Sequence, residues 1–95
     1  MKWLLLVRPK AESDLQAARD WYDLKSPGLG DRFLDEVASA LGELALRPEM
    51  PRPYFLSFRR VLLRRFPYKI FYQLIGPRVV IFRVLHAKQS HPSNL

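Results

Sequence analysis

The stretch from Phe58 to His86 constrains the fold of this chain more than any other part of the sequence. It reads FRRVLLRRFPYKIFYQLIGPRVVIFRVLH and is rich in Ile, Val, Phe and Tyr, which fit a pleated, half-buried strand. Pro67 lacks the N–H that a strand ladder needs, and Gly76-Pro77 stands at hairpin spacing between two apolar runs. The stretch therefore predicts two or three adjacent strands, over about 59–66, 68–75 and 78–85.

The alternation of side chains along these strands predicts two sheet faces of different character. In the strand over 68–75, one face carries Tyr68, Ile70, Tyr72 and Leu74, and the other carries Lys69, Phe71, Gln73 and Ile75. In the strand over 78–85, we expect a fully apolar face of Val80, Phe82 and Val84, with Arg83 in the opposite row. Four arginines bracket the apolar centre of the first strand: Arg59, Arg60, Arg64 and Arg65. A face that mixes cations with large apolar groups indicates a surface that receives a partner.

The first half of the chain predicts a short strand followed by two helices. The apolar run within residues 1–8 indicates a buried strand, and Pro9 suits the first turn of a helix that ends near Lys25. A second helix, from about 29–31 to Arg47, carries an apolar stripe and is stopped by Pro48.

These elements predict one small α+β domain over residues 1–95, in the order β-α-α-β-β-β. The Pro-Gly turn between the helices makes them an antiparallel hairpin, whose apolar stripes need one face of a mainly antiparallel sheet to cover. Residues 49–57 contain two prolines and form an irregular connector, and residues 87–95 have no periodicity and form a tail.

The charge of the chain is distributed unevenly. The formal net charge is +7, and none of the nine Asp and Glu residues follows Glu49. The part from Arg52 to the end is therefore purely cationic, which favours an anionic partner such as nucleic acid or an acidic protein segment. A soluble basic domain with no charge-selected partner remains an open alternative.

Composition also excludes several classes of protein. The chain has no cysteine, which excludes disulfides and thiolate metal sites, and we predict neither a metal nor another cofactor. The apolar run from Trp3 to Val7 is too short for a signal peptide or a membrane span. We therefore expect a cytoplasmic protein with no membrane partner.

A set of motifs spread over nearly the whole chain resembles one known family. They are Ala11, Asp14-Leu15 and Tyr22, then Phe33, Leu41 and Arg47-Pro48, then RRFPYKIFYQL over 64–74 and VVIFRVLHAK over 79–88. In this order they resemble the RelE/ParE superfamily of bacterial type II toxins, and more closely its ParE and plasmid-stabilisation branch. The resemblance implies a toxin held inactive by an acidic antitoxin segment that is disordered when free and folds on binding.

The same resemblance leaves the target of the toxin open. ParE-like members inhibit DNA gyrase without nuclease chemistry, whereas RelE-like members cleave mRNA at the ribosome. We predict the gyrase reading, with no catalysis, and keep a ribosome-dependent or free mRNA endonuclease as the alternative. A nucleic-acid-binding module without toxicity is the third reading.

The candidate site residues for each predicted function follow from their positions in the sequence. For a ribonuclease, Lys69, Arg83 and His86 are the candidates for holding the phosphate and moving protons. Gln89 departs from the basic residue that the resemblance implies near Lys88, and the C-terminal tyrosine of RelE-like members has no counterpart except His91. For binding the antitoxin or the target we predict Arg59, Arg60, Arg64, Arg65, Lys69, Arg83 and Lys88. Trp21 is a possible contact to the antitoxin or to a second copy in a homodimer.

Overall fold

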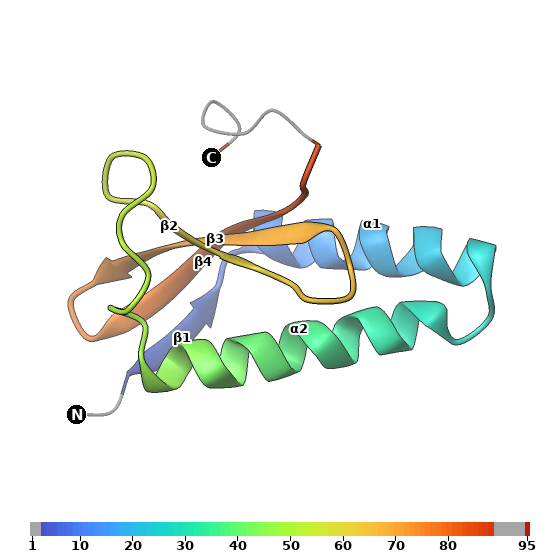
Figure 1. The fold of residues 1–95 in the computed structure, drawn as a ribbon, viewed down its shortest axis with the longest axis horizontal. Coiled ribbons are helices and arrows are strands. Elements are labelled where there is room, and N and C mark those ends of the chain that lie inside the picture. The colour runs from blue at the N-terminus through green and yellow to red at the C-terminus, as the bar shows by residue number, and fades with distance from the viewer. Residues whose placement is uncertain (1–2, 89–94) are drawn as a thin grey trace.

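Residues 3–88 and 95 are described by the computed structural model, and they form two helices and one sheet (Figure 1). The elements follow one another as β1 Leu4–Val7, α1 Pro9–Lys25, α2 Leu29–Leu46, β2 Arg59–Leu62, β3 Tyr68–Ile75 and β4 Arg78–His86. This order is the predicted one, and the prediction of an α+β domain is confirmed. Gln89 and His91, with most of the predicted tail, lie outside the described residues.

The strands lie in the sheet in the order β1-β4-β3-β2. β2, β3 and β4 are antiparallel neighbours, whereas β1 runs parallel to β4, with Leu4 opposite Arg78 and Val7 opposite Ile81. A parallel pair needs a long connection, which here includes the helical hairpin between β1 and the later strands. Figure 1 shows the two antiparallel helices as a layer on one side of this mainly antiparallel sheet.

A β-bulge in β4 changes which residues share a face. Phe71 pairs with Arg83 but Tyr72 pairs with Ile81, so Phe82 is an extra residue without an opposite partner. The predicted apolar row of Val80, Phe82 and Val84 is therefore wrong. Val79, Ile81 and Val84 instead join the buried cluster under the helices, because one inserted residue reverses the alternation beyond it.

The first of the later strands is shorter than predicted. It ends at Leu62 and not at Phe66, because the chain turns there: the Leu63 N–H donates to the Tyr68 carbonyl at 3.0 Å, and the Tyr68 N–H donates to the Phe66 carbonyl at 2.8 Å. Arg64 and Arg65 consequently lie in the turn that joins β2 and β3.

Aromatic rings from both layers form the centre of the core. The Phe33 ring of α2 lies 5.3 Å from that of Phe66 and 5.0 Å from that of Tyr68, and the Tyr22 ring of α1 lies 5.4 Å from Phe33. Tyr72 is fully buried and donates its hydroxyl to the Pro48 carbonyl at 2.8 Å, and burial raises the pKa of this phenol to about 12. The contacts of Tyr72 fix the end of α2 against β3.

Candidate functional site

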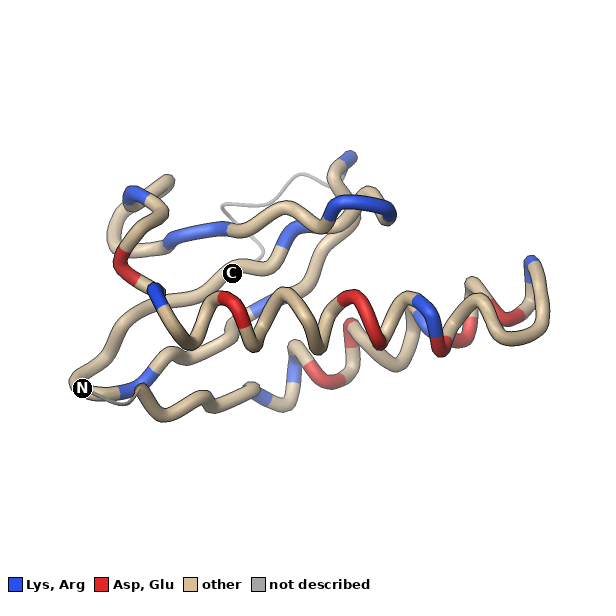
Figure 2. Tube along the Cα trace, turned by 60° about the horizontal axis from the view of Figure 1, so that its bottom comes forward, with Lys and Arg blue, Asp and Glu red and all other residues tan. Residues whose placement is uncertain are grey.

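The four arginines around β2 lie in three different environments. Arg60 is opposite Phe71, on the sheet face away from the helices, whereas Arg59 is opposite Tyr72, on the helix side. Arg64 and Arg65 lie in the turn after β2. Figure 2 shows Asp and Glu mainly along the two helices and Lys and Arg along β2, the turn and the connector. The predicted arginine surface is therefore divided, because the side chains of successive strand residues point to opposite faces.

Arg59 and Arg60 both hold the connector between α2 and β2. The Arg59 guanidinium donates from Nη1 to the Glu49 carbonyl at 2.9 Å and to the Pro51 carbonyl at 2.7 Å. The Arg60 guanidinium lies 3.8 Å from the centre of the Tyr54 ring, which is a cation–π contact. These contacts order the connector and leave charge on the surface around it.

Arg64 and Arg65 lie opposite the acids of α2. The Arg64 guanidinium lies 4.0 Å from the Glu43 carboxylate, and both side chains are largely exposed, at 86% and 71%. The backbone N–H of Arg65 donates to the Glu36 carboxylate at 2.8 Å. An exposed ion pair such as Arg64–Glu43 contributes little to stability, so a binding partner can replace it at small cost.

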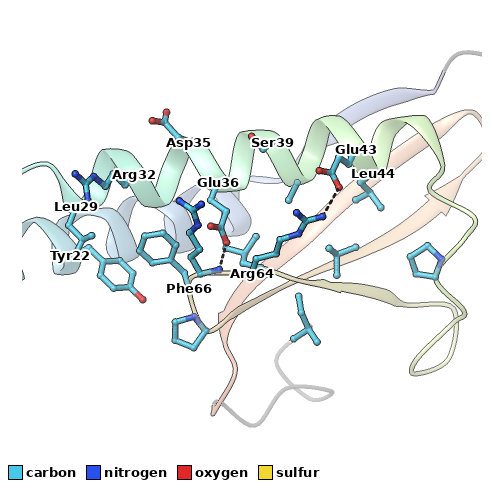
Figure 3. Close-up of a pocket in the computed structure, with 17 residues that line it drawn as sticks. Tyr22, Leu29, Arg32, Asp35, Glu36, Ser39, Glu43, Leu44, Arg64 and Phe66 are labelled. Atoms are coloured by element: carbon cyan, nitrogen blue, oxygen red, sulfur yellow. Dashed lines mark hydrogen bonds and ion pairs between the residues drawn. The ribbon is translucent and has the colours of Figure 1, made fainter.

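A groove of about 1030 Å³ separates α2 from β2 and from the turn that follows it. Figure 3 shows Glu36 and Glu43 directed from α2 toward the side of the groove on which Arg64 lies. Its apolar lining includes Leu29, Ala40, Leu44, Val61, Leu63 and Phe66, and its charged lining includes Arg32, Asp35, Glu36, Glu43, Arg64 and Arg65. The groove exists because α2 packs mainly on α1, while α1 is the helix whose backbone approaches the sheet at β4.

The α2 side of the groove was not singled out from the sequence, although a signal was present. Leu29, Arg32, Glu36, Ala40 and Glu43 follow one another at intervals of three or four residues. This spacing places all five on one stripe of a helix. The sequence alone does not show what this stripe faces, and only the position of β2 shows that it lines a groove.

Arg83, predicted as a phosphate or partner ligand, forms an ion pair within the fold. Its guanidinium donates from Nε to Asp14 Oδ2 at 2.7 Å and from Nη2 to Asp14 Oδ1 at 2.8 Å. The Val84 N–H also donates to Asp14 Oδ2, at 3.0 Å. The hydrogen bonds to Asp14 raise the pKa of Arg83, so its charge is fixed and directed toward α1.

Lys69 and His86, the other two ribonuclease candidates, point to opposite faces of the sheet. His86 is opposite Tyr68 on the helix side of the sheet, and the two rings lie 5.3 Å apart. Lys69 follows Tyr68 in β3 and is opposite Leu85, so its side chain faces away from the helices. The structure therefore does not bring these two side chains together. Lys88 is exposed just after β4, and its N–H donates to His86 Nδ1 at 3.1 Å.

A smaller pocket, of about 340 Å³, lies beside His86. It is lined by Asp14, Ala17, Ala18, Trp21, Tyr68, Val84 and His86. Burial, and then the nearby Asp14 carboxylate, raise the pKa of Tyr68 further above neutral pH. Trp21 is 52% exposed at the edge of this pocket. Among the described residues, no group of three His, Cys, Asp or Glu side chains is placed to hold a metal ion.

Comparisons with known proteins place this geometry in context. The family described as "ParE toxin of type II toxin-antitoxin system, parDE" matches residues 5–91. No curated protein sequence matches the chain. No helix in the described part of the chain has the length and apolar character to span a membrane.

Solved structures that share the fold include chains of three toxin–antitoxin systems. A chain of the chromosomal ParDE toxin–antitoxin system from P. aeruginosa is 21% identical with a TM-score of 0.83, covering 92% of this chain and 98% of that one. A chain of the RelBE2 complex from Mycobacterium tuberculosis is 24% identical with a TM-score of 0.65, covering 90% and 99%. A chain of the intact RelBE complex from E. coli is 18% identical with a TM-score of 0.66, covering 92% and 99%.

Proposed function

Because this chain belongs to the ParE toxin family of type II toxin–antitoxin systems, we propose that a cognate antitoxin neutralises it by occupying the groove beside α2. The observation that carries this proposal is the groove itself, which has an apolar floor and a charged rim. A segment with one apolar face and acidic flanks fits it: the apolar face covers Ala40, Leu44 and Val61. Its carboxylates replace Glu43 beside Arg64.

The action on the cell is inhibition of DNA gyrase by protein binding, without catalysis. Two observations support this part of the proposal. Lys69 and His86 point to opposite sheet faces, and Arg83 is already bound by Asp14, so no single phosphate is within reach of all three in this arrangement. Cationic side chains for a protein target are present at Arg60 and at the exposed Lys88.

An mRNA endonuclease is the second candidate, and the pocket beside His86 favours it. The pocket joins an imidazole, a protonated phenol and the indole of Trp21, which are groups that can transfer protons and stack on bases. Purified chain that cleaves a transcript, alone or with ribosomes, and leaves gyrase supercoiling intact would establish this candidate in place of the first.

The groove is tested by filling it. Ser39 lines the groove and Ala38 does not, and both are exposed neighbours on α2. We expect Ser39→Trp to weaken binding of the antitoxin by about tenfold or more, because the indole occupies the space of the incoming apolar face. Ala38→Trp is the matched control and leaves the affinity unchanged. Calorimetric titration with the purified antitoxin measures both, and equal affinities for the two variants would refute the groove as the antitoxin site.

The toxin class is tested in cells. We expect expression of the chain alone to arrest growth, and co-expression of its cognate antitoxin to restore growth. A chain that leaves growth unaffected at high level would exclude the toxin reading and favour the third reading, a nucleic-acid-binding module without toxicity.

A further inference from the structure

The connector between α2 and β2 carries a concentration of exposed apolar side chains. Met50 is 69% exposed, Tyr54 39%, Phe55 37% and Leu56 78%. Figure 1 shows the connector rising from the end of α2 and projecting beyond the strands on the side away from α2. Apolar side chains gathered on a projecting loop indicate contact with another protein.

The tip of the connector is a tight turn with an unfavourable residue in it. The Phe58 N–H donates to the Phe55 carbonyl at 2.8 Å, which closes a four-residue turn with Leu56 at its second position. Leu56 has a φ of +55°, in the left-handed region that glycine occupies without strain. A leucine there is strained, and because its side chain is 78% exposed at the tip, its own burial does not offset that strain.

Hydrogen bonds from side chains of β2 and β3 hold the connector in place. Tyr72 donates to the Pro48 carbonyl, Arg59 donates to the Glu49 and Pro51 carbonyls, and Gln73 donates from Nε2 to the Ser57 hydroxyl at 2.8 Å. The Phe58 ring also packs edge-on against the ring of Phe82 at 5.0 Å. A tip ordered before binding avoids much of the conformational entropy that a mobile loop loses on association.

The surroundings of the tip are cationic. Arg60 lies over the Tyr54 ring, Arg52 is exposed within the connector, and no Asp or Glu follows Glu49 in the sequence. An apolar tip on a connector that carries Arg52 and contacts Arg60 is complementary to an apolar pocket with an acidic rim.

We propose that Leu56 is the anchor by which this toxin docks on its protein target, entering an apolar pocket rimmed by Asp and Glu side chains on a folded partner. This inference rests on the proposed function and deepens it, because it assigns the target to the connector and the antitoxin to the groove beside α2. The strained leucine is then explained by its role in the complex, since the pocket of the partner supplies the burial that the free chain lacks.

The test is Leu56→Gly in the full chain. Glycine fits φ +55° without strain, so the variant keeps or gains stability while it loses the anchor. We expect the concentration that arrests growth or inhibits gyrase supercoiling to rise by about tenfold or more, with antitoxin affinity unchanged. Leu24→Ala is the matched control, because Leu24 is also a leucine, 86% exposed on α1, and its removal leaves both activities unchanged.

Two variants of Leu56 with opposite charges test the acidic rim of the proposed pocket. Leu56→Asp and Leu56→Lys both remove the apolar anchor, but only the aspartate meets repulsion from an acidic rim. We expect the lysine variant to retain more activity than the aspartate variant. Higher activity of the aspartate variant would refute the proposal that the pocket of the partner has an acidic rim.

Other results separate this inference from the function on which it rests. Full toxicity of Leu56→Gly at equal protein level would overturn the inference and leave the toxin function standing. Loss of antitoxin binding in Leu56→Gly would overturn it by assigning the tip to the antitoxin. A wild-type dimer that this variant converts to monomer would assign the tip to a second copy of the chain. A wild-type chain without toxicity would remove the proposed function and the inference together.

Discussion

At the scale of single residues, Asp14 supplies β4 with a hydrogen-bond acceptor of the kind that a neighbouring strand would supply. β1 ends at Val7, so within the described part of the chain β4 continues to His86 without a strand beside it on that edge. The Asp14 carboxylate, projecting from α1, accepts the Val84 N–H and two hydrogen bonds from Arg83. A backbone donor that would otherwise lack a partner is satisfied, and α1 is fixed to the sheet at the same point.

We therefore predict that Asp14→Asn destabilises the chain. The side chains of Asp14 and Arg83 are only 14% and 19% exposed, so loss of the charge leaves Arg83 poorly compensated and costs about 2–3 kcal/mol. Asp20→Asn is the control, because Asp20 is 61% exposed in its pair with Arg19 and its change costs below about 0.5 kcal/mol. Urea unfolding at neutral pH measures both, and similar midpoints for the two variants would contradict the structural role.

The case of Arg83 also shows what the sequence could not reveal at this scale. An arginine in a strand of a basic chain indicates a ligand for an anion, and the residue type alone supports that reading. Its actual partner is Asp14, 69 residues earlier in the chain. Only the packing of α1 along β4 brings the two together, and no local pattern encodes that contact.

At the scale of elements, the crossing of the two helices depends on Gly30. The Gly30 N–H donates to the Asp23 carboxylate at 2.8 Å, which connects the start of α2 to the last turns of α1. A Cβ at this position would overlap the carbonyl oxygen of Arg19 and lie 2.8 Å from the Asp23 carboxylate oxygen. The nearest of these atoms belongs to the backbone of α1, so it cannot move aside unless the helix itself shifts.

The two glycines of α2 are therefore predicted to respond in opposite directions to alanine. Gly30→Ala destabilises by about 2 kcal/mol or more, because the helices must separate. Gly42→Ala stabilises by about 0.5–1 kcal/mol, because a Cβ there meets nothing within 4 Å and alanine favours the helix. The melting temperature should fall by about 8 °C or more in the first variant and rise by a few degrees in the second. A fall of the same size in both would refute the close approach at Gly30.

Element order was predictable because it depends on local signals. Helix boundaries are set locally by Pro9 at the start of α1, by the Pro-Gly turn before α2 and by Pro48 after it. These residues limit a helix whatever the tertiary contacts around them. The bulge at Phe82 and the early end of β2 depend instead on how neighbouring strands pair. The early end of β2 places Arg64 and Arg65 in a turn, and the alternation along β2 separates Arg59 from Arg60, so the arginines that were expected on one surface lie on several.

At the scale of the whole molecule, the two edges of the sheet are protected unequally. The β2 edge carries Arg59 and Arg60, and charge on an edge strand opposes pairing with other chains. The β1 edge carries three leucines in succession, Leu4, Leu5 and Leu6, that are 56%, 41% and 49% exposed. β1 is therefore the part of the described sheet most open to unwanted association.

The backbone of β1 adds to this exposure. Leu4 and Arg8 donate their N–H groups toward the β4 side, to Pro77 and Ile81. Residues between them alternate, so Leu5 and Val7 present N–H and C=O groups to the open edge. Apolar side chains beside unsatisfied ladder groups are the combination that allows another strand to add.

We predict that Leu5→Lys reduces self-association of the isolated toxin, because a charge on the edge strand must lose hydration when a second strand pairs with it. Static light scattering over hours at 37 °C should rise more slowly than for the wild type. Leu24→Lys is the control: Leu24 is more exposed, but it lies near the end of α1, and a helix offers no strand edge with which another chain can pair. If both lysine variants slow the scattering equally, net charge and not the edge governs association, and β1 would no longer explain it.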